Sequence, residues 1–186
     1  MKAVYGLCII IFLLCLVAGC KKDAAKNVVE GNWKVVNVTG KVTSSTGADS
    51  GTYTYSYNPA DSLLSYTAIT TSHPLPLTTN QTIFETWNFI SADTCTVTST
   101  YAGLTSGELT GSWNGAYTLQ NSLLFLASGT SKLLALIGID SPPYAGNYDQ
   151  FNIQSVSSNQ MVLNYNTVVN DSNSVAQVNF TFTFGK

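Results

Sequence analysis

Residues that could carry out hydrolytic chemistry are scarce in this chain. The single histidine, His73, lies in the segment His73-Pro74-Leu75-Pro76-Leu77, whose prolines require an extended or looped backbone. A Ser-His-Asp unit would have to use His73, yet no Gly-x-Ser-x-Gly motif occurs. We therefore predict that the protein is not an enzyme and needs no cofactor.

Metal ligands are equally few. One histidine and one cysteine beyond residue 20, Cys95, cannot build a histidine-rich cluster. Asp140 and Asp149 flank a proline loop, but they lie nine residues apart without the alternating ligand spacing of a calcium loop. We expect a solvated loop there and no metal site. Cys95 alternates with Val97 on a predicted strand, which indicates a buried, unreactive thiol.

One carboxylate has an unusual setting. Glu85 alternates with Trp87 and Phe89 along residues 82–90, so the three side chains share one face of a predicted strand. If that face points inward, the carboxylate needs a partner or a ligand; at a rim it would be solvated. The candidate ligand-cavity residues are Trp33, Glu85, Trp87, Phe89, Trp113 and Tyr117. The competing interpretation is that the aromatic side chains simply fill a core.

Charge is sparse along the whole chain. Charged residues make up 10% of the sequence, where about a quarter is usual, and the net charge is −2. All eight basic residues are lysines, and none lies between Lys41 and Lys132. Nucleic-acid binding requires clustered cations, so we exclude it.

The N-terminus has the composition of a secretory signal. Lys2 precedes an apolar run over residues 7–16, and the small residues Val17-Ala18-Gly19 follow it. A transmembrane helix needs about 20 apolar residues, and this run is too short before the charges of residues 21–23. Residues 1–19 are therefore predicted to be a signal peptide.

Val17-Ala18-Gly19-Cys20 resembles the bacterial lipobox. The resemblance implies that the Cys20 thiol is lipidated and that this residue becomes the new N-terminus, with residues 20–29 as a tether. Several acyl chains anchor a protein stably, at about 0.8 kcal/mol per buried methylene. The expected partner is thus a membrane, and the expected location is the cell envelope, at the outer membrane. Because Cys8 and Cys15 leave with the signal, Cys95 alone remains in the domain and no internal disulfide can form.

Two short motifs resemble signals of Bacteroidota lipoproteins. Lys21-Lys22-Asp23 resembles the tract that directs such proteins to the cell surface, although a plain soluble tether explains it equally. Asp61-Ser62-Leu63 resembles the O-glycosylation site of that phylum, with Ser62 as the acceptor. The membrane face, periplasmic or surface, stays open.

From Gly31 onward, apolar and polar residues alternate with period two between turn residues, which predicts antiparallel strands. Residues 132–139 fit either a short helix or a buried strand, and Gly111 and Gly115 suggest a bulge or a bend. The predicted strands are 32–39, 51–57, 82–90, 94–101, 108–119, 123–126, 150–156, 161–168 and 175–184. The fold class is all-β, an up-and-down barrel of about eight strands over residues 30–186, with a β-sandwich as the alternative.

Three segments of this domain are similar to lipocalin-like lipoproteins of Bacteroidota. Gly31-Asn32-Trp33 opens the first strand as a Gly-x-Trp, residues 115–123 resemble the central hairpin, and residues 151–163 resemble the closing strands. The resemblance implies a barrel whose floor Trp33 closes and which binds a small apolar ligand. Lipocalins often stack an arginine on this tryptophan; the chain has none, and Lys186 is the only candidate in that place.

The expected function is that of an envelope lipoprotein whose barrel binds a small apolar ligand or an envelope component. The alternative is a glycan-binding or adhesive β-sandwich. Its basis would be exposed tyrosines that stack on sugar rings, namely Tyr53, Tyr55, Tyr57 and Tyr66.

Overall fold

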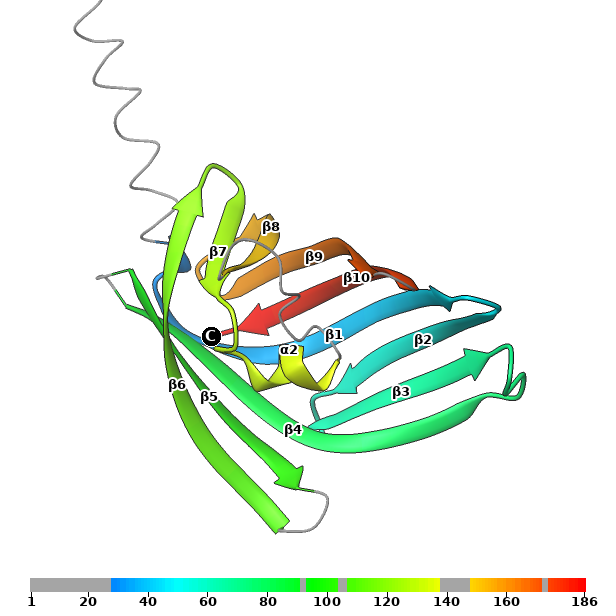
Figure 1. Cartoon of the computed structure of the whole chain (residues 1–186). Coiled ribbons are helices and arrows are strands. Elements are labelled where there is room, and N and C mark those ends of the chain that lie inside the picture. The colour runs from blue at the N-terminus through cyan, green and yellow to red at the C-terminus, as the bar shows by residue number, and fades with distance from the viewer. Residues whose placement is uncertain (1–27, 91–92, 104–106, 138–147, 172–173) are drawn as a thin grey trace, which may run out of the picture.

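The computed structural model describes residues 28–90, 93–103, 107–137, 148–171 and 174–186. They include ten strands and the short helix α2 (Lys132–Leu136), as Figure 1 shows. The strands are β1 (Gly31–Thr46), β2 (Asp49–Asn58), β3 (Leu63–Thr70), β4 (Leu77–Ile90), β5 (Thr94–Gly103), β6 (Gly107–Gln120), β7 (Leu123–Ala127), β8 (Tyr148–Val156), β9 (Gln160–Asp171) and β10 (Ser174–Gly185).

The strands close into a barrel. Each is antiparallel to the next along the chain, and β1 pairs with β10 from Lys34↔Gly185 to Thr46↔Ser174. Closure removes the two unpaired edges that an open sheet would expose. The predicted up-and-down barrel is therefore confirmed, and the alternative β-sandwich is not formed.

The two ends of the barrel are formed by different sets of strands. At its start β1 pairs with β4, from Gly31↔Phe89 to Lys34↔Thr86, whereas from Thr39 to Thr46 it pairs with β2. The hairpin of β2 and β3 is thus inserted between β1 and β4 at one end only. Eight strands surround the end that lacks the hairpin, which we call the narrow end, and the opposite end, which contains the hairpin, we call the wide end. β7 belongs to the narrow end, because along β6 it pairs only with Tyr117–Gln120.

Alternation positions the core. In β1 Trp33 and Val35 point inward, a register shift follows between Val35 and Asn37, and Val38 points inward again. Because side chains alternate with period two, this β-bulge changes which positions face inward along the strand. The largest fully buried side chains are mostly aromatic: Trp33, Trp87, Tyr117, Phe89, Phe151, Phe180, Phe182 and Phe184.

The two glycines of β6 have a different role from the predicted bulge. The pairing of β5 with β6 runs without a shift from Thr94↔Ala116 to Gly103↔Gly107, so a bulge at these glycines is wrong. A Cβ at Gly111 would lie 2.4 Å from the ring of Trp113, and one at Gly115 would lie 2.2 Å from Oγ1 of Thr130. The missing side chains make room for these close contacts.

The ambiguous segment 132–139 begins as a helix. α2 covers Lys132–Leu136, and residues 138 and 139 lie outside the described part of the chain. Among the residues that the structure describes, no helix has the length and apolar composition needed to cross a membrane.

Candidate functional site

Aromatic rings fill the narrow end of the barrel. The ring centre of Trp87 lies 4.9 Å from that of Phe184 and 5.8 Å from that of Phe151, and Phe89 lies 4.9 Å from Tyr117. Trp33 is opposite Trp87 in register, fully buried, and donates its indole N–H to the carbonyl of Val29 at 2.6 Å. The structure therefore brings most of the candidate aromatic residues into one packed layer.

Trp113 is separate from this layer. Its side chain is only half-buried, and the ammonium of Lys132, at the start of α2, lies 5.4 Å from its ring centre. It flanks α2 rather than the packed aromatic layer. Whether any of the candidate aromatic residues contacts a ligand stays a prediction.

Glu85 is the centre of a buried hydrogen-bond cluster. Its side chain is 1% exposed and points into the barrel from β4. Two donors come from the wall: Nε1 of Trp87 bonds Oε1 at 2.7 Å, and the hydroxyl of Ser99 on β5 bonds Oε2. Two more come from the α2 segment: the hydroxyl of Ser131 bonds Oε1 at 2.6 Å, and the backbone N–H of Leu133 bonds Oε2 at 3.0 Å.

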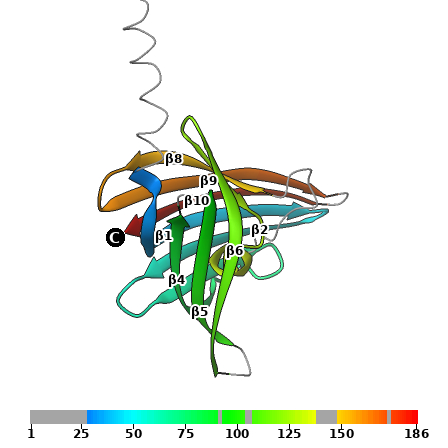
Figure 2. The same ribbon diagram turned by 90° about the vertical axis from the view of Figure 1, so that its left-hand side faces the viewer.

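The α2 segment lies inside the ring of strands, as Figures 1 and 2 show. Ser131 is its N-cap and accepts the N–H of Leu134 at 3.2 Å, a typical way to start a helix. Leu133, Leu134 and Ile137 are 0–2% exposed and belong to the barrel core. Since the N-terminus of a helix carries partial positive charge, the Glu85 carboxylate is well placed against it.

Burial and hydrogen bonding act on Glu85 in opposite directions. Loss of water raises the pKa of this carboxyl above its usual range, while the bonds from Ser131, Ser99, Trp87 and Leu133 lower it. The same region disfavours other negatively charged groups. Burial, followed by the charge of Glu85, raises the pKa of the Cys95 thiol to about 12. Cys95 is free and fully buried, which confirms the prediction of a buried thiol, and such burial disfavours the reactive thiolate.

Tyr57 places a second polar group near Glu85. The side chain is 6% exposed, and within the described residues its hydroxyl has no hydrogen-bond partner. Burial raises its pKa and the charge of Glu85 adds to the effect, whereas the neighbouring Ser62 hydroxyl lowers it without reaching hydrogen-bond geometry. A buried hydroxyl without a partner costs about 1–3 kcal/mol, so this position calls for an explanation.

Asp149 is a second buried carboxylate. It is 5% exposed on β8, and burial raises its pKa to about 6 although a hydrogen bond from Ser128 opposes the shift. Tyr165 nearby has its pKa raised to about 12 by burial and by the charge of Asp149. The expected solvated loop is therefore wrong for Asp149, while Asp140 lies outside the described residues. In the described ranges no three His, Cys, Asp or Glu side chains group into a metal site.

The tyrosines proposed to stack on sugars do not form an exposed platform. Tyr55 and Tyr57 are buried, and Tyr53 and Tyr66 pack against the core. The ring of Tyr55 lies 5.7 Å from that of Tyr66 and 5.2 Å from that of Phe180. The basis for the glycan-binding alternative is thus wrong.

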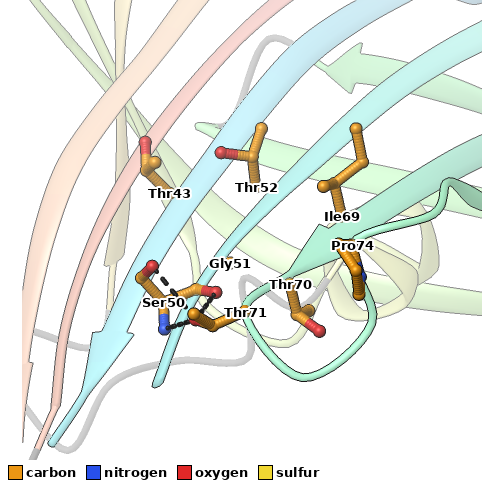
Figure 3. Close-up of a pocket in the computed structure, with 8 residues that line it drawn as sticks. All are labelled: Thr43, Ser50, Gly51, Thr52, Ile69, Thr70, Thr71 and Pro74. Atoms are coloured by element: carbon orange, nitrogen blue, oxygen red, sulfur yellow. Dashed lines mark hydrogen bonds between the residues drawn. The ribbon is translucent and has the colours of Figure 1, made fainter. Parts of the chain in front are cut away.

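A pocket of about 310 Å³ lies on the outer wall, where β1 and β3 end and β2 begins. Figure 3 shows the residues that line it, none of which is charged. Two hydrogen bonds join Thr71 to Ser50: the Thr71 hydroxyl accepts the Ser50 N–H at 2.7 Å and donates to the Ser50 carbonyl at 2.9 Å. The lining residues are Thr43, Ser50, Gly51, Thr52, Ile69, Thr70, Thr71 and Pro74. Such a neutral hollow offers no strong binding group.

The two candidate modification sites differ in what can be said of them. Ser62 is half-buried in the turn between β2 and β3, with a φ of 51°, and its carbonyl accepts the N–H of Ile83 at 2.8 Å. Cys20 and residues 21–23 lie outside the described part of the chain. Lipidation and glycosylation both stay predictions.

The sequence did not identify the partners of Glu85. Ser131 is followed by an apolar segment and has the type of a helix N-cap, so a capping signal was available. No pattern indicated that this cap meets a carboxylate 46 residues earlier in the chain. Ser99 carried no signal beyond its place in a strand, and Tyr57 was a candidate only for stacking on sugars.

No protein-family model and no curated protein matches the chain. Among solved structures, a lipocalin-like protein from Bacteroides uniformis is similar, with 10% sequence identity and a TM-score of 0.35. The similarity covers 81% of this chain and 96% of the other. The fold assignment rests on the strand pairing of this chain itself.

Proposed function

We propose that this protein is a lipid-anchored envelope lipoprotein whose barrel binds a small apolar ligand in the space that α2 occupies. The observation that carries the proposal is the filling of the barrel interior by Leu133, Leu134 and Ile137 of a short connecting segment, in addition to the wall residues. A five-residue helix is too short to be stable alone and depends on the contacts that hold it.

The interior of the barrel supports a ligand space where α2 lies. Apolar side chains of α2 belong there to the same buried core as the wall side chains, so this part of the interior is filled by a connecting segment and not by the strands alone. Ligand pockets are typically concave and apolar with a few polar groups that fix orientation. Displacement of the α2 segment would leave an apolar space with Glu85 at its base.

The predicted tether would orient this ligand space relative to the membrane. β1 starts at the narrow end, so Val28, the first described residue, lies there, and a lipid on Cys20 would hold that end toward the membrane. The wide end then faces away from the anchor, where a ligand can enter from solvent.

The anchor is tested by expressing the full chain and a Cys20→Ala variant in a Bacteroidota host with a labelled fatty acid. The wild-type protein should carry label and sediment with membranes, and the variant should do neither. Label on both proteins, or on neither, would overturn the anchoring.

Ligand binding is tested on the same material. Native mass spectrometry and lipid analysis of the purified protein should show a bound apolar molecule of defined mass. A protein that yields no such molecule, and that takes up no apolar probe after delipidation, would overturn the binding function.

Glycosylation at Ser62 is a separate part of the proposal. Intact mass of the protein from the same host should show hexose increments that Ser62→Ala abolishes. A mass equal to that of the unmodified chain would remove this part alone.

A further inference from the structure

Glu85 accepts two hydrogen bonds from the strands of the wall and two from the α2 segment. Trp87 and Ser99 belong to neighbouring wall strands and stay with the carboxylate as long as the barrel is folded. Ser131 and Leu133 belong to the connecting segment, and they leave if α2 moves. Without these two hydrogen bonds, the buried carboxylate oxygens of Glu85 would each lack one donor. A ligand that replaces α2 must therefore bring a hydrogen-bond donor to Glu85.

The environment of the Tyr57 hydroxyl is a second observation, independent of the Glu85 hydrogen bonds, that indicates a ligand-binding position. This hydroxyl is buried near the turn at Ser62, whose carbonyl accepts the N–H of Ile83, two residues from Glu85, and it makes no hydrogen bond in the part of the chain that the structure describes. A phenol can both donate and accept. A group that donates to Glu85 and also bonds Tyr57 would replace one of the two donors that leave with α2 and would give the Tyr57 hydroxyl a partner, which Ser131 does not do.

The surroundings favour a neutral head group over a cation. Four donors already surround the carboxylate, and no lysine or histidine of the described residues is paired with it. Lys132, at the start of α2, is instead placed over the Trp113 ring. The group that now meets Glu85 from the connecting segment is a hydroxyl, that of Ser131, at 2.6 Å.

The space that the α2 side chains occupy beside Glu85 suits a hydrocarbon tail. Leu133, Leu134 and Ile137 are aliphatic, 0–2% exposed, and part of the same core as the aromatic wall residues. An alkyl chain that replaced them would keep the apolar contacts of the wall.

We propose that Glu85 and Tyr57 form the head-group site for a neutral, hydroxyl-bearing lipid, such as a fatty alcohol or a monoacylglycerol, and that Ser131 occupies this site while the barrel is empty. The proposal rests on the proposed ligand-binding function and names its ligand class. The lipid hydroxyl donates to Glu85 and accepts from Tyr57, and its alkyl chain takes the place of the α2 side chains.

The test uses the mature chain from residue 20 with Cys20→Ala, delipidated, and four probes of equal chain length: dodecanol, dodecane, dodecylamine and dodecanoate. Binding is followed by tryptophan fluorescence below the micelle concentration. Dodecanol should bind about tenfold or more tightly than each of the other three, the discrimination expected when a site built for a hydroxyl is left unpaired.

Two variants separate the site from general apolar binding. Tyr57→Phe should weaken dodecanol about fivefold, the effect of one hydrogen bond, and leave dodecane unchanged. Because this hydroxyl has no partner in the empty barrel, the variant should fold as well as the wild type. Ser131→Ala should tighten dodecanol about fivefold, since α2 loses one bond to Glu85. The matched controls are Tyr53→Phe on the same strand and Ser112→Ala on the outer face of β6.

Equal affinity for dodecanol and dodecane, or a Tyr57→Phe variant that binds dodecanol normally, would overturn the head-group site and leave apolar binding intact. Tightest binding of dodecylamine or dodecanoate would overturn the neutral ligand class. If no probe binds, both this site and the proposed ligand-binding function are overturned.

Discussion

The ammonium of Lys186 lies 4.4 Å from the ring centre of Trp33. The same nitrogen donates a hydrogen bond to the carbonyl of Glu30 at 3.1 Å. The contact thus ties the residue after β10 to the segment that enters β1, at the narrow end of the barrel. Trp33 is fully buried under this cation, so Lys186 occupies the place that the resemblance to lipocalins assigns to an arginine.

The Lys186 contact predicts a small but measurable stability effect. Lys186→Ala should lower the free energy of unfolding by about 0.5–1 kcal/mol, because it removes a cation–π contact at a partly exposed site. Lys186→Arg should retain most of the stability, since a guanidinium also stacks on an indole. Urea unfolding measures both, with Lys41→Ala on the outer face of β1 as the control. A loss as large for Lys41→Ala would contradict the assignment.

The barrel could be predicted because most strands alternate strictly between apolar and polar residues. In β10 the buried side chains Val178, Phe180, Phe182 and Phe184 repeat at every second position. β3 was missed because its pattern is weak: Leu64 is its only buried side chain, and its inward position 68 is an alanine. Without β3, the insertion of a hairpin between β1 and β4 could not be derived.

The candidate site was predictable only in part. Glu85 shares a face with Trp87 and Phe89, which is enough to name it as a candidate but does not decide between an inward carboxylate and a solvated one at a rim. Which partner it finds depends on the path of the connecting segment through the barrel, and no local pattern encodes that path. Tyr57 was assigned to a strand correctly, but whether its hydroxyl is exposed or buried depends on closure of the ring.

The cluster around Glu85 predicts that this residue holds α2 in place. Glu85→Ala should lower the free energy of unfolding by about 2–4 kcal/mol, because it leaves buried donors of Trp87, Ser99, Ser131 and Leu133 unsatisfied. Hydrogen exchange should then increase in residues 128–137 more than in β5. Asn88→Ala, on the outer face of the same strand, is the control. Unchanged protection of residues 128–137 would show that α2 does not depend on Glu85.

Asp149 predicts a pH dependence of stability. Its pKa is raised to about 6 in the folded protein, from an ordinary value of 3.8, so between those values the folded state binds more protons than the unfolded state. Stability should therefore fall as the pH rises from about 4 to 6, and stay level above. Glu85, whose pKa is also raised, adds a slope of the same sign.

Asp149→Asn isolates the first of these contributions. At pH 7.5 the variant should be more stable than the wild type by about 1–2 kcal/mol, and at pH 4 the difference should nearly vanish. Thermal unfolding at the two pH values measures it. An equal gain at both would mean that Asp149 is not destabilised by its charge.

Gly40 predicts a packing constraint between the first and last strands. It is paired with Phe180, and a Cβ added at Gly40 would lie 2.1 Å from a carbon of the Phe180 ring. Phe180 is fully buried, so its ring has little room to move. Gly40→Ala should therefore lower the free energy of unfolding by about 1–3 kcal/mol through overpacking.

A double-mutant cycle with Phe180→Leu checks the cause. The smaller side chain should relieve the clash, so that the double variant loses at least about 1 kcal/mol less than the sum of the two single variants. Urea unfolding of the four proteins gives this coupling. If the two effects simply add, Gly40 is required for a reason other than the Phe180 ring, because a glycine that serves only to admit that ring becomes replaceable once the ring is gone.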